Sequence, residues 1–312
     1  MTIHHSPVAH CGGLGPDRVG HRGVSKSDPT AAAVFSRYPT GSKPLLHLSG
    51  RMLLSLALIS SWTLPSPAQQ TGTGKDAGIE DARLVKVLNL DGPQLHFHVQ
   101  GIDLDQTHVW VTSVDKQGHK GYLHQFDRAT GKLERQVEIT DGPRYHPGGF
   151  SLAGDSLWIP VAEYTAHSSA VIEEIDAKTL VVKRKIPIAD HLSCVAVTSD
   201  SLIAGNWDSR QFYVLDFSGK QRALVENPST NTSYQEIKFV DGMLMASGPL
   251  SHTTGSIDWY TWPSLKLVRS LRASSTDRNK AYSAEGVAIK GTDLYVLPED
   301  GPDRYFHFVL EK

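Results

Sequence analysis

The segment GGFSLAGDSLWIPVAE, residues 148–163, is one of five related segments in this 312-residue chain. Each consists of a short apolar strand, a small turn, a second apolar strand and a polar, usually acidic, end. The other four are QGIDLDQTHVWVTSVD (residues 100–115), SCVAVTSDSLIAGNWD (193–208), QEIKFVDGMLMASGPL (235–250) and EGVAIKGTDLYVLPED (285–300). A repeat of about 45 residues built from short strands is typical of a β-propeller with one blade per repeat. The repeats therefore predict that equivalent residues of all copies meet around one axis.

The apolar strand at residues 84–90 predicts how the ring of blades closes. The first four copies are each followed by two more strands joined by a tight turn, but the fifth is followed by only one, at residues 305–310. Residues 84–90 precede the first copy just as residues 133–139 precede the second. Closing the ring with this strand would pair an exposed sheet edge. We therefore predict an all-β, five-bladed β-propeller over residues 83–312, in which the N-terminal strand completes the last blade. A sandwich would not explain the permuted repeat.

The first 82 residues differ from the repeats in composition. Residues 1–51 are rich in Gly, Ser, Pro and His, and we interpret them as a non-native or disordered extension upstream of the true start. Residues 52–68 hold a short apolar run followed by Ser-Pro-Ala, which indicates a signal peptide, since the run is too short to span a bilayer. Residues 69–82 are typical of a flexible leader. We therefore predict a periplasmic or secreted protein with no membrane span in its mature form.

The composition argues against several function classes. The net charge is −2, with no basic stripe of the kind that nucleic-acid binding requires. The chain has no Gly-rich phosphate loop, HExxH, Gly-x-Ser-x-Gly or paired CxxC motif, which argues against the common nucleotide-binding, zincin and serine-hydrolase classes. Cys194 is the only cysteine of the predicted mature chain, and we interpret it as a buried apolar residue rather than a reactive thiol. We expect a monomer.

The first residues of the innermost strands line up in all five copies. The aligned positions are His98, His146, His191, Ser233 and Ser283. Two residues later stand Gln100, Gly148, Ser193, Gln235 and Glu285. Because side chains alternate along a strand, both sets are expected to face the central channel, one ring at its mouth and one deeper. An alignment from the Asp-Gly-Pro side selects His96 in place of His98.

The ends of the second strands also line up, and four of the five are acidic. They are Asp115, Glu163, Asp208, Leu250 and Asp300. Antiparallel up-and-down order places these ends on the same face as the histidines. Arg144, Tyr145 and Tyr164 flank the same mouth. The candidate ligand-binding residues are Gln100, Ser193, Gln235, Asp115, Asp208, Asp300, Arg144 and Tyr164.

Three converging imidazoles predict a metal site at this mouth. His98, His146 and His191 could hold zinc, iron, copper or nickel. Glu285 is the only ionisable residue of the deeper ring, and it and Glu163 are the candidate catalytic residues for proton transfer. The alternative is structural: histidines at strand entries satisfy backbone groups, and acids in loops make local turns.

Several segments resemble known propeller repeats. FDRATGKLERQVEI and IDAKTLVVKRKIPI are similar to blades of exported bacterial propellers of the quinoprotein and surface-layer type. The fuller pattern of HVQGI, DGPRYHPGGF, LWIPVAEY and GNWDSRQFYVLD resembles a family of exported propellers that is a domain of unknown function. The resemblance covers about residues 83–312 and implies a propeller fold and export. It implies neither an activity nor a quinone cofactor.

Two functions of different classes agree with these patterns. The first is an exported propeller that binds a small molecule, a glycan or a protein at the pocket lined by histidines and acids. The second is a metal-dependent hydrolase or lyase, in which three histidines hold the ion. The fold does not decide between them, since propellers serve both purposes.

Overall fold

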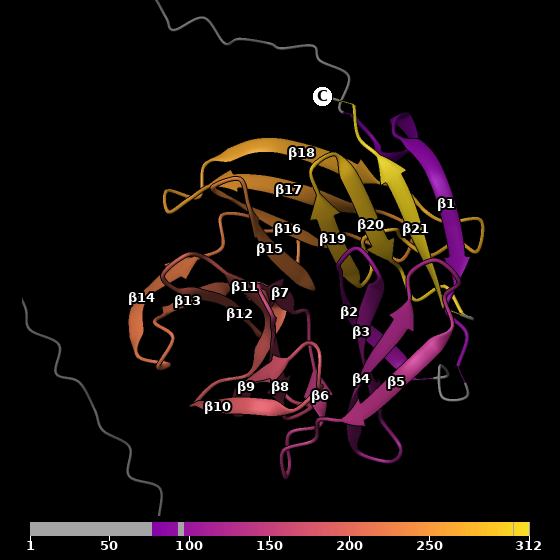
Figure 1. Cartoon of the computed structure of the whole chain (residues 1–312). Coiled ribbons are helices and arrows are strands. Elements are labelled where there is room, and N and C mark those ends of the chain that lie inside the picture. The colour runs from indigo at the N-terminus through magenta and orange to yellow at the C-terminus, as the bar shows by residue number, and fades with distance from the viewer. Residues whose placement is uncertain (1–76, 93–96, 302, 312) are drawn as a thin grey trace, which may run out of the picture. The chain divides into compact units, whose positions relative to one another are not determined.

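The computed structural model describes residues 77–92, 97–301 and 303–311, and these residues form five antiparallel sheets around a common axis (Figure 1). The sheets confirm the predicted five-bladed β-propeller. Blade 1 holds β2 (His98–Leu104), β3 (His108–Asp115), β4 (Lys120–Asp127) and β5 (Leu133–Glu138). Blade 2 holds β6 (His146–Pro147), β7 (Ser151–Ala153), β8 (Ser156–Ala162), β9 (Ala170–Asp176) and β10 (Val182–Ile188).

The other three blades follow the same order from the axis outward. Blade 3 holds β11 (Leu192–Val197), β12 (Leu202–Asn206), β13 (Gln211–Leu215) and β14 (Gln221–Glu226). Blade 4 holds β15 (Glu236–Val240), β16 (Met243–Pro249), β17 (Gly255–Thr261) and β18 (Leu267–Ala273). Blade 5 holds β19 (Gly286–Lys290), β20 (Asp293–Leu297), β21 (Arg304–Val309) and, outermost, β1 (Arg83–Asn89).

The pairing of β1 with β21 closes the ring, as the permuted repeat predicts. The two strands are antiparallel, with Arg83 opposite Val309 and Asn89 opposite Arg304. The last blade therefore combines the first and the final strands of the propeller, which Figure 1 shows side by side. This closure supplies backbone partners to an edge of β21 that would otherwise be exposed.

The hydrophobic core of the described residues consists of five clusters, one between each pair of neighbouring blades. The cluster between blades 1 and 2, for example, packs Trp110 of β3 against Phe150 and Leu157 of blade 2. Trp158 and Tyr295, at the matching positions of their blades, lie in two other clusters. These aromatic residues therefore hold blades together, because each buries a large apolar surface between two sheets.

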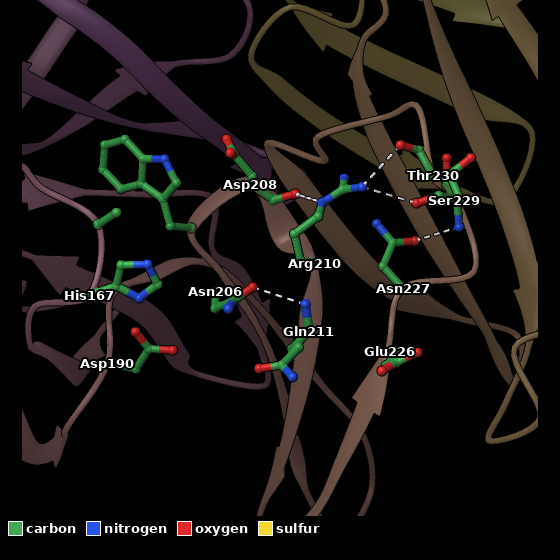
Figure 2. A pocket seen from close by; sticks show the side chains of 12 residues that line it. His167, Asp190, Asn206, Asp208, Arg210, Gln211, Glu226, Asn227, Ser229 and Thr230 are labelled. Atoms are coloured by element: carbon green, nitrogen blue, oxygen red, sulfur yellow. Dashed lines mark hydrogen bonds between the residues drawn. The ribbon is translucent and has the colours of Figure 1, made fainter. Parts of the chain in front are cut away.

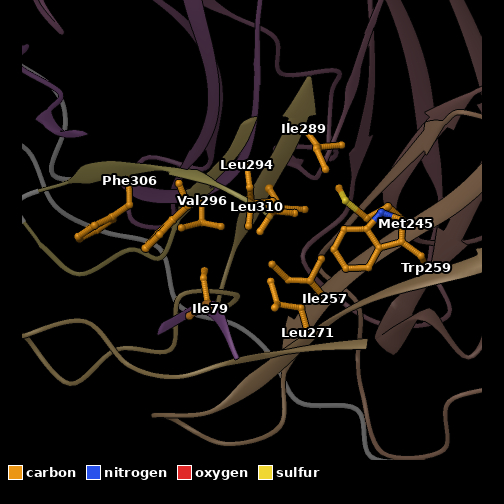
Figure 3. Packing of buried hydrophobic residues seen from close by; sticks show 12 residues of the cluster. Ile79, Met245, Ile257, Trp259, Leu271, Ile289, Leu294, Val296, Phe306 and Leu310 are labelled. Atoms are coloured by element: carbon orange, nitrogen blue, oxygen red, sulfur yellow. The ribbon is translucent and has the colours of Figure 1, made fainter. Parts of the chain in front are cut away.

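The segment just before β1 packs against the propeller instead of forming part of a flexible leader. A short 3₁₀ turn, η1 (Ile79–Asp81), places Ile79 at 0% exposure in the cluster between blades 4 and 5 (Figure 3). The backbone of Gly78 pairs with that of Arg272 in β18. The prediction of a flexible leader is therefore wrong for residues 77–82, where one buried isoleucine anchors the chain.

The predicted extension and signal peptide, and the first part of the leader, lie outside the described residues. In the described part of the chain, no helix is long and apolar enough to cross a membrane.

Glycines near the axis allow two inner strands to approach closely. In blade 2 the inner strand is interrupted between β6 and β7, and there Gly149 pairs in parallel with Cys194 of blade 3. Its amide donates a hydrogen bond to the Ser193 carbonyl at 2.9 Å. A Cβ atom at Gly148 would lie only 1.9 Å from the Ser193 carbonyl oxygen. Glycine is therefore required here because the neighbouring backbone occupies the space of a side chain.

We expect Gly148→Ala to lower the free energy of unfolding by about 2–3 kcal/mol, because the new methyl group would push two inner strands apart. The measurement is chemical denaturation of both proteins. Gly242→Ala is the matched control: Gly242 has φ +77° and open space around its Cβ position, so it tests backbone strain alone. We expect the control to cost about 1 kcal/mol. Equal losses in both variants would contradict the close approach of the strands.

Candidate metal and ligand site

Three histidines lie together where the innermost strands begin, at the end of the channel that we call the histidine face. His98 begins β2, His146 begins β6, and His191 immediately precedes β11. The ring centroids of His146 and His191 are 5.5 Å apart. These residues come from three successive blades and lie at the same mouth of the channel, as the alignment of strand entries predicts.

Each of the three histidines has a partner of its own. The His146 Nε2 atom lies 2.9 Å from the Gln100 side-chain oxygen. The His191 Nδ1 atom lies 2.9 Å from the carbonyl oxygen of Glu163 and so acts as a donor. His98 pairs through Nδ1 with the carboxylate of Glu299.

One group of side chains at this mouth has the spacing of metal ligands. Among the described residues, only His98, Glu285 and Glu299 form a set of three or more such groups with ligand atoms within 4.8 Å of one another. This cluster differs from the predicted three-histidine set. His146 and His191 are not members of it; one ring nitrogen of each faces the Gln100 amide oxygen or backbone carbonyls instead. We call the three residues the His–Glu cluster.

The His–Glu cluster brings one buried and one half-buried carboxyl group together beside a half-buried imidazole. Glu285 is 8% exposed, and its burial, followed by the Glu299 carboxylate, raises its pKa well above the usual range. Burial alone would raise the pKa of Glu299. The hydrogen bond with His98 and the positive charges of His98 and Lys280 outweigh burial and lower this pKa. The Lys280 ammonium lies 3.2 Å from the Glu299 carboxylate. Two carboxylates therefore share one close lysine and one imidazole.

Glu299 is the residue of the cluster that the repeat alignment misses. The alignment selects the next residue, Asp300, whose carboxylate instead accepts a hydrogen bond from Arg304 Nε at 3.1 Å. Glu299 has a φ of +54°, which bends the chain at the end of the strand pair. Its position before an equally acidic residue is the only sequence signal that could have identified it.

His146 lies in an aromatic and basic environment beside the cluster. The ring of Tyr164 lies 4.2 Å from it, centroid to centroid, and the Lys116 ammonium lies 5.0 Å from the Tyr164 ring. Burial, followed by the charges of His191, His98 and Lys116, lowers the pKa of His146 to about 3. His146 is therefore neutral at physiological pH, and its buried Nδ1 atom has no hydrogen-bond partner in the described part of the protein.

Several other predicted ligand residues have local structural partners. The Asp115 carboxylate accepts hydrogen bonds from the amides of Gln117 and Gly118 at 3.0 and 2.8 Å, which is turn geometry. The Ser193 hydroxyl donates to the Asn206 carbonyl at 2.9 Å. Asp300 belongs to the arginine pair described above. These three side chains are therefore engaged within or between blades.

Glu163 and Arg144 meet through a shared serine at the rim of the mouth. The Ser169 hydroxyl donates to the Glu163 carboxylate at 2.6 Å, and Arg144 Nε donates to the same hydroxyl oxygen at 2.9 Å. Arg144 also pairs with Asp141 at 2.7 Å. The structure thus links two of the predicted site residues to each other, but not to the His–Glu cluster.

In the described part of the chain, the pockets of the histidine face include two that adjoin predicted site residues. The first, with a volume of about 440 Å³, is lined by Ser233, Gln235, His252, Lys280 and Glu285, and it therefore adjoins the His–Glu cluster. We call it the cluster pocket. The second, with a volume of about 580 Å³, lies over blade 3 and includes Trp207 and Asp208 in its lining (Figure 2). We call it the blade-3 pocket.

The opposite end of the channel is filled by buried ions. The Lys238 ammonium lies 3.0 Å from the Glu236 carboxylate and 3.4 Å from that of Asp103, and it donates to the Phe150 carbonyl. Lys290 approaches Asp103 from outside, at 3.0 Å. Burial raises the pKa of Glu236 to about 7. We call Asp103, Glu236 and Lys238 the ionic plug.

Five sheets arranged in a closed ring define the chain as a five-bladed β-propeller. The polar mouth is a candidate ligand site at one end of its channel. A model of a family of unknown function, DUF6454, matches residues 114–258. This match confirms the predicted resemblance to a propeller family of unknown function. No curated protein matches the chain.

Solved structures with a similar fold include the glutaminyl cyclase of Myxococcus xanthus. It is 11% identical, with a TM-score of 0.55, and the match covers 74% of this chain and 97% of that one. The Pan2 WD40 domain of Neurospora crassa is 10% identical, with a TM-score of 0.42 and coverages of 76% and 98%. A protein of unknown function from Bacteroides caccae is 9% identical, with a TM-score of 0.45 and coverages of 66% and 72%. At such identity the first likeness supports the fold alone.

Proposed function

We propose that this protein is an exported propeller that binds a divalent transition-metal ion at the His–Glu cluster and a small anionic molecule beside it. Export rests on the apolar run and the small-residue pattern near residue 66. The other two parts rest on the geometry of the histidine face and are argued in turn.

The observation that carries the metal proposal is the spacing of His98, Glu285 and Glu299, whose ligand atoms lie within 4.8 Å of one another. One imidazole and two carboxylates are ligands that zinc and related ions accept, and three protein ligands leave a coordination position open. The charge balance points the same way. Burial and the Glu299 carboxylate raise the pKa of Glu285, and a bound divalent cation would offset both effects and favour its ionised form.

The cluster pocket supports a small, anionic ligand. Its volume of about 440 Å³ suits a metabolite-sized molecule rather than a glycan chain or a protein segment. Glu285 and Lys280 are part of its lining, so a ligand there would reach both the open position of the ion and an ammonium group. A carboxylate or a similar oxyanion satisfies both contacts.

The alternative, a hydrolase or lyase with a three-histidine metal site, requires His98, His146 and His191 to share one ion. Among the described residues these three histidines do not form a group with ligand atoms within 4.8 Å of one another, whereas His98, Glu285 and Glu299 do. The likeness to a glutaminyl cyclase supports no activity at 11% identity. Metal-assisted ligand binding is therefore the better-supported function.

The metal content of the full chain, purified without a polyhistidine tag, tests the proposal. We expect one zinc ion per chain after dialysis against zinc, measured by mass spectrometry, and loss of that ion in His98→Asn. His191→Asn is the matched control, because it changes a histidine of the same mouth that lies outside the His–Glu cluster. Loss of zinc in both variants would favour the three-histidine site, and absence of zinc from the native protein would refute metal binding.

A further inference from the structure

A third pocket lies between blades 1 and 2, and we call it the interblade pocket. Its volume of about 610 Å³ is within the range of small-molecule sites. No residue of the His–Glu cluster, the cluster pocket or the blade-3 pocket belongs to its lining. The lining includes Trp110, Gln125, Arg135, Leu152, Ala177 and Lys178.

The interblade pocket lies where one repeat position carries a small residue. This position, at the start of the turn after the third strand, faces the preceding blade. It holds Arg128, Ala177, Phe217, Trp262 and Leu310 in blades 1 to 5.

The four large side chains at this position fill the spaces between their blades. The Phe217 ring lies 5.5 Å from the Trp158 ring, and the Arg128 guanidinium lies 5.2 Å from the Tyr295 ring. Trp262 and Leu310 pack in the clusters that their blades share with the preceding blade. Ala177 has only a methyl group to offer, so the space between blades 1 and 2 stays open.

Arg135 brings a positive charge to this pocket without an acidic partner. Its Nε donates to the Gln125 side-chain oxygen at 2.6 Å, and Gln125 lies opposite Trp110 in the sheet. At the matching positions of blade 2, Arg184 pairs with the Glu174 carboxylate at 2.7 Å. Because Gln125 is neutral where Glu174 is charged, the Arg135 guanidinium is left without an ion-pair partner among the described residues.

Trp110 has a buried polar atom without a partner. The side chain is 1% exposed, and its Nε1 atom has no hydrogen-bond partner in the described part of the chain. At the matching place between blades 5 and 1, Arg128 donates a hydrogen bond to the Tyr295 hydroxyl at 2.6 Å. A buried donor without an acceptor costs free energy. The groups of the interblade pocket that lack partners are therefore donors.

The acidic side chains of the lining do not neutralise Arg135. The Asp105 carboxylate accepts hydrogen bonds from the amides of Thr107 and His108 at 2.7 Å each, within its own turn. Asp155 is exposed, and so is Lys178, the second cation of the lining.

We propose that the interblade pocket binds a small aromatic carboxylate, with its ring in the space beside Ala177 and its carboxylate on the Arg135 guanidinium. Phe217 is the template in the next blade. It brings a ring to 5.5 Å from the Trp158 ring and its own carbonyl oxygen to 2.6 Å from Arg184. A molecule the size of phenylacetate therefore spans the two equivalent contacts between blades 1 and 2. A carboxylate in place of the carbonyl also supplies the charge that Arg135 lacks.

Titration calorimetry of the full chain with phenylacetate tests this inference. A chelator is present throughout, so that the result does not depend on the metal site. We expect saturable binding by the native chain. Ala177→Phe should abolish it by filling the pocket as Phe217 fills the next one, and Arg135→Gln should weaken it about tenfold. Thermal melting checks that each variant is folded; Arg135 is exposed, so its variant tests the site even if Ala177→Phe does not fold.

Arg184→Gln is the matched control, because Arg184 occupies the same repeat position beside a space that Phe217 already fills. Its replacement should leave phenylacetate affinity unchanged. Native affinity in folded Ala177→Phe or in Arg135→Gln, no binding by the native chain, or tighter binding of the cation phenethylamine would overturn the proposal. Binding that is lost in Lys280→Met and kept in Ala177→Phe would also overturn it, because it would place the carboxylate in the cluster pocket.

Discussion

Replacing Glu299 by glutamine should weaken zinc binding to the full chain at least about 100-fold. Glutamine keeps the size of the side chain but removes the charge and one of the oxygens that can bind an ion. Mutating a residue that only hydrogen-bonds a metal ligand typically lowers metal affinity about 10–100-fold. Loss of a ligand itself should therefore lower the affinity by about 100-fold or more. Competition titration with a zinc-binding dye measures the affinity.

Lys280→Met should have the opposite effect on the same titration. The Lys280 ammonium lies 3.2 Å from the Glu299 carboxylate and competes with an ion for it. We expect its removal to strengthen zinc binding about threefold to fivefold. Glu163→Gln is the control, because Glu163 lies on the same face and hydrogen-bonds Ser169 instead. Weaker zinc binding in Lys280→Met, or native affinity in Glu299→Gln, would contradict the proposed ligand set.

Replacing Lys238 by methionine should be the most destabilising change in the ionic plug. The Lys238 side chain is 5% exposed and pairs with Glu236 and Asp103. Methionine of similar length fills the space but leaves two buried carboxylates without their shared cation. Breaking a buried ion pair from one side costs about 3–5 kcal/mol. We expect that loss in the free energy of unfolding at pH 8, measured by urea denaturation.

The same loss should be smaller at pH 5. Burial raises the folded-state pKa of Glu236 to about 7, above its ordinary value of 4.5, so the folded state gains stability as pH falls from 7 toward 4.5. At pH 5 Glu236 is protonated and uncharged. Removing Lys238 then leaves only the Asp103 carboxylate without this cation. Lys290→Met is the control: its side chain also approaches Asp103 but is 45% exposed, and we expect a loss below about 1 kcal/mol. Equal losses in the two variants at pH 8 would refute the role of Lys238.

The fold could be predicted from the sequence because each blade repeats the same strand pattern. The copy at residues 148–163 and its four relatives fix the number of blades, and the permuted strand at residues 84–90 fixes the closure. The break of the inner strand at Gly148 and Gly149 could not be predicted, because it depends on backbone contact with the next blade. The burial of Ile79 between blades 4 and 5 could not be predicted either, because a single apolar residue in a polar leader gives no periodic signal.

The candidate site could be predicted only in part. Alignment of the strand entries brings His98, His146 and His191 to one mouth, because it follows the main-chain path. It does not say which way a side chain turns at the end of a strand, where φ changes sign. Glu299 and Asp300 illustrate this limit: the alignment selects Asp300, whereas the structure turns Glu299 toward His98. Pairing between distant side chains, such as Lys280 with Glu299, leaves no trace in the repeat.

Anomalous X-ray diffraction at the zinc edge, from crystals of the full chain grown with zinc, is the most direct test of the metal site. The proposal predicts one strong peak at the histidine face, about 2.0–2.2 Å from ligand atoms of His98, Glu285 and Glu299. A peak between His146 and His191, or no peak at this mouth, would contradict it.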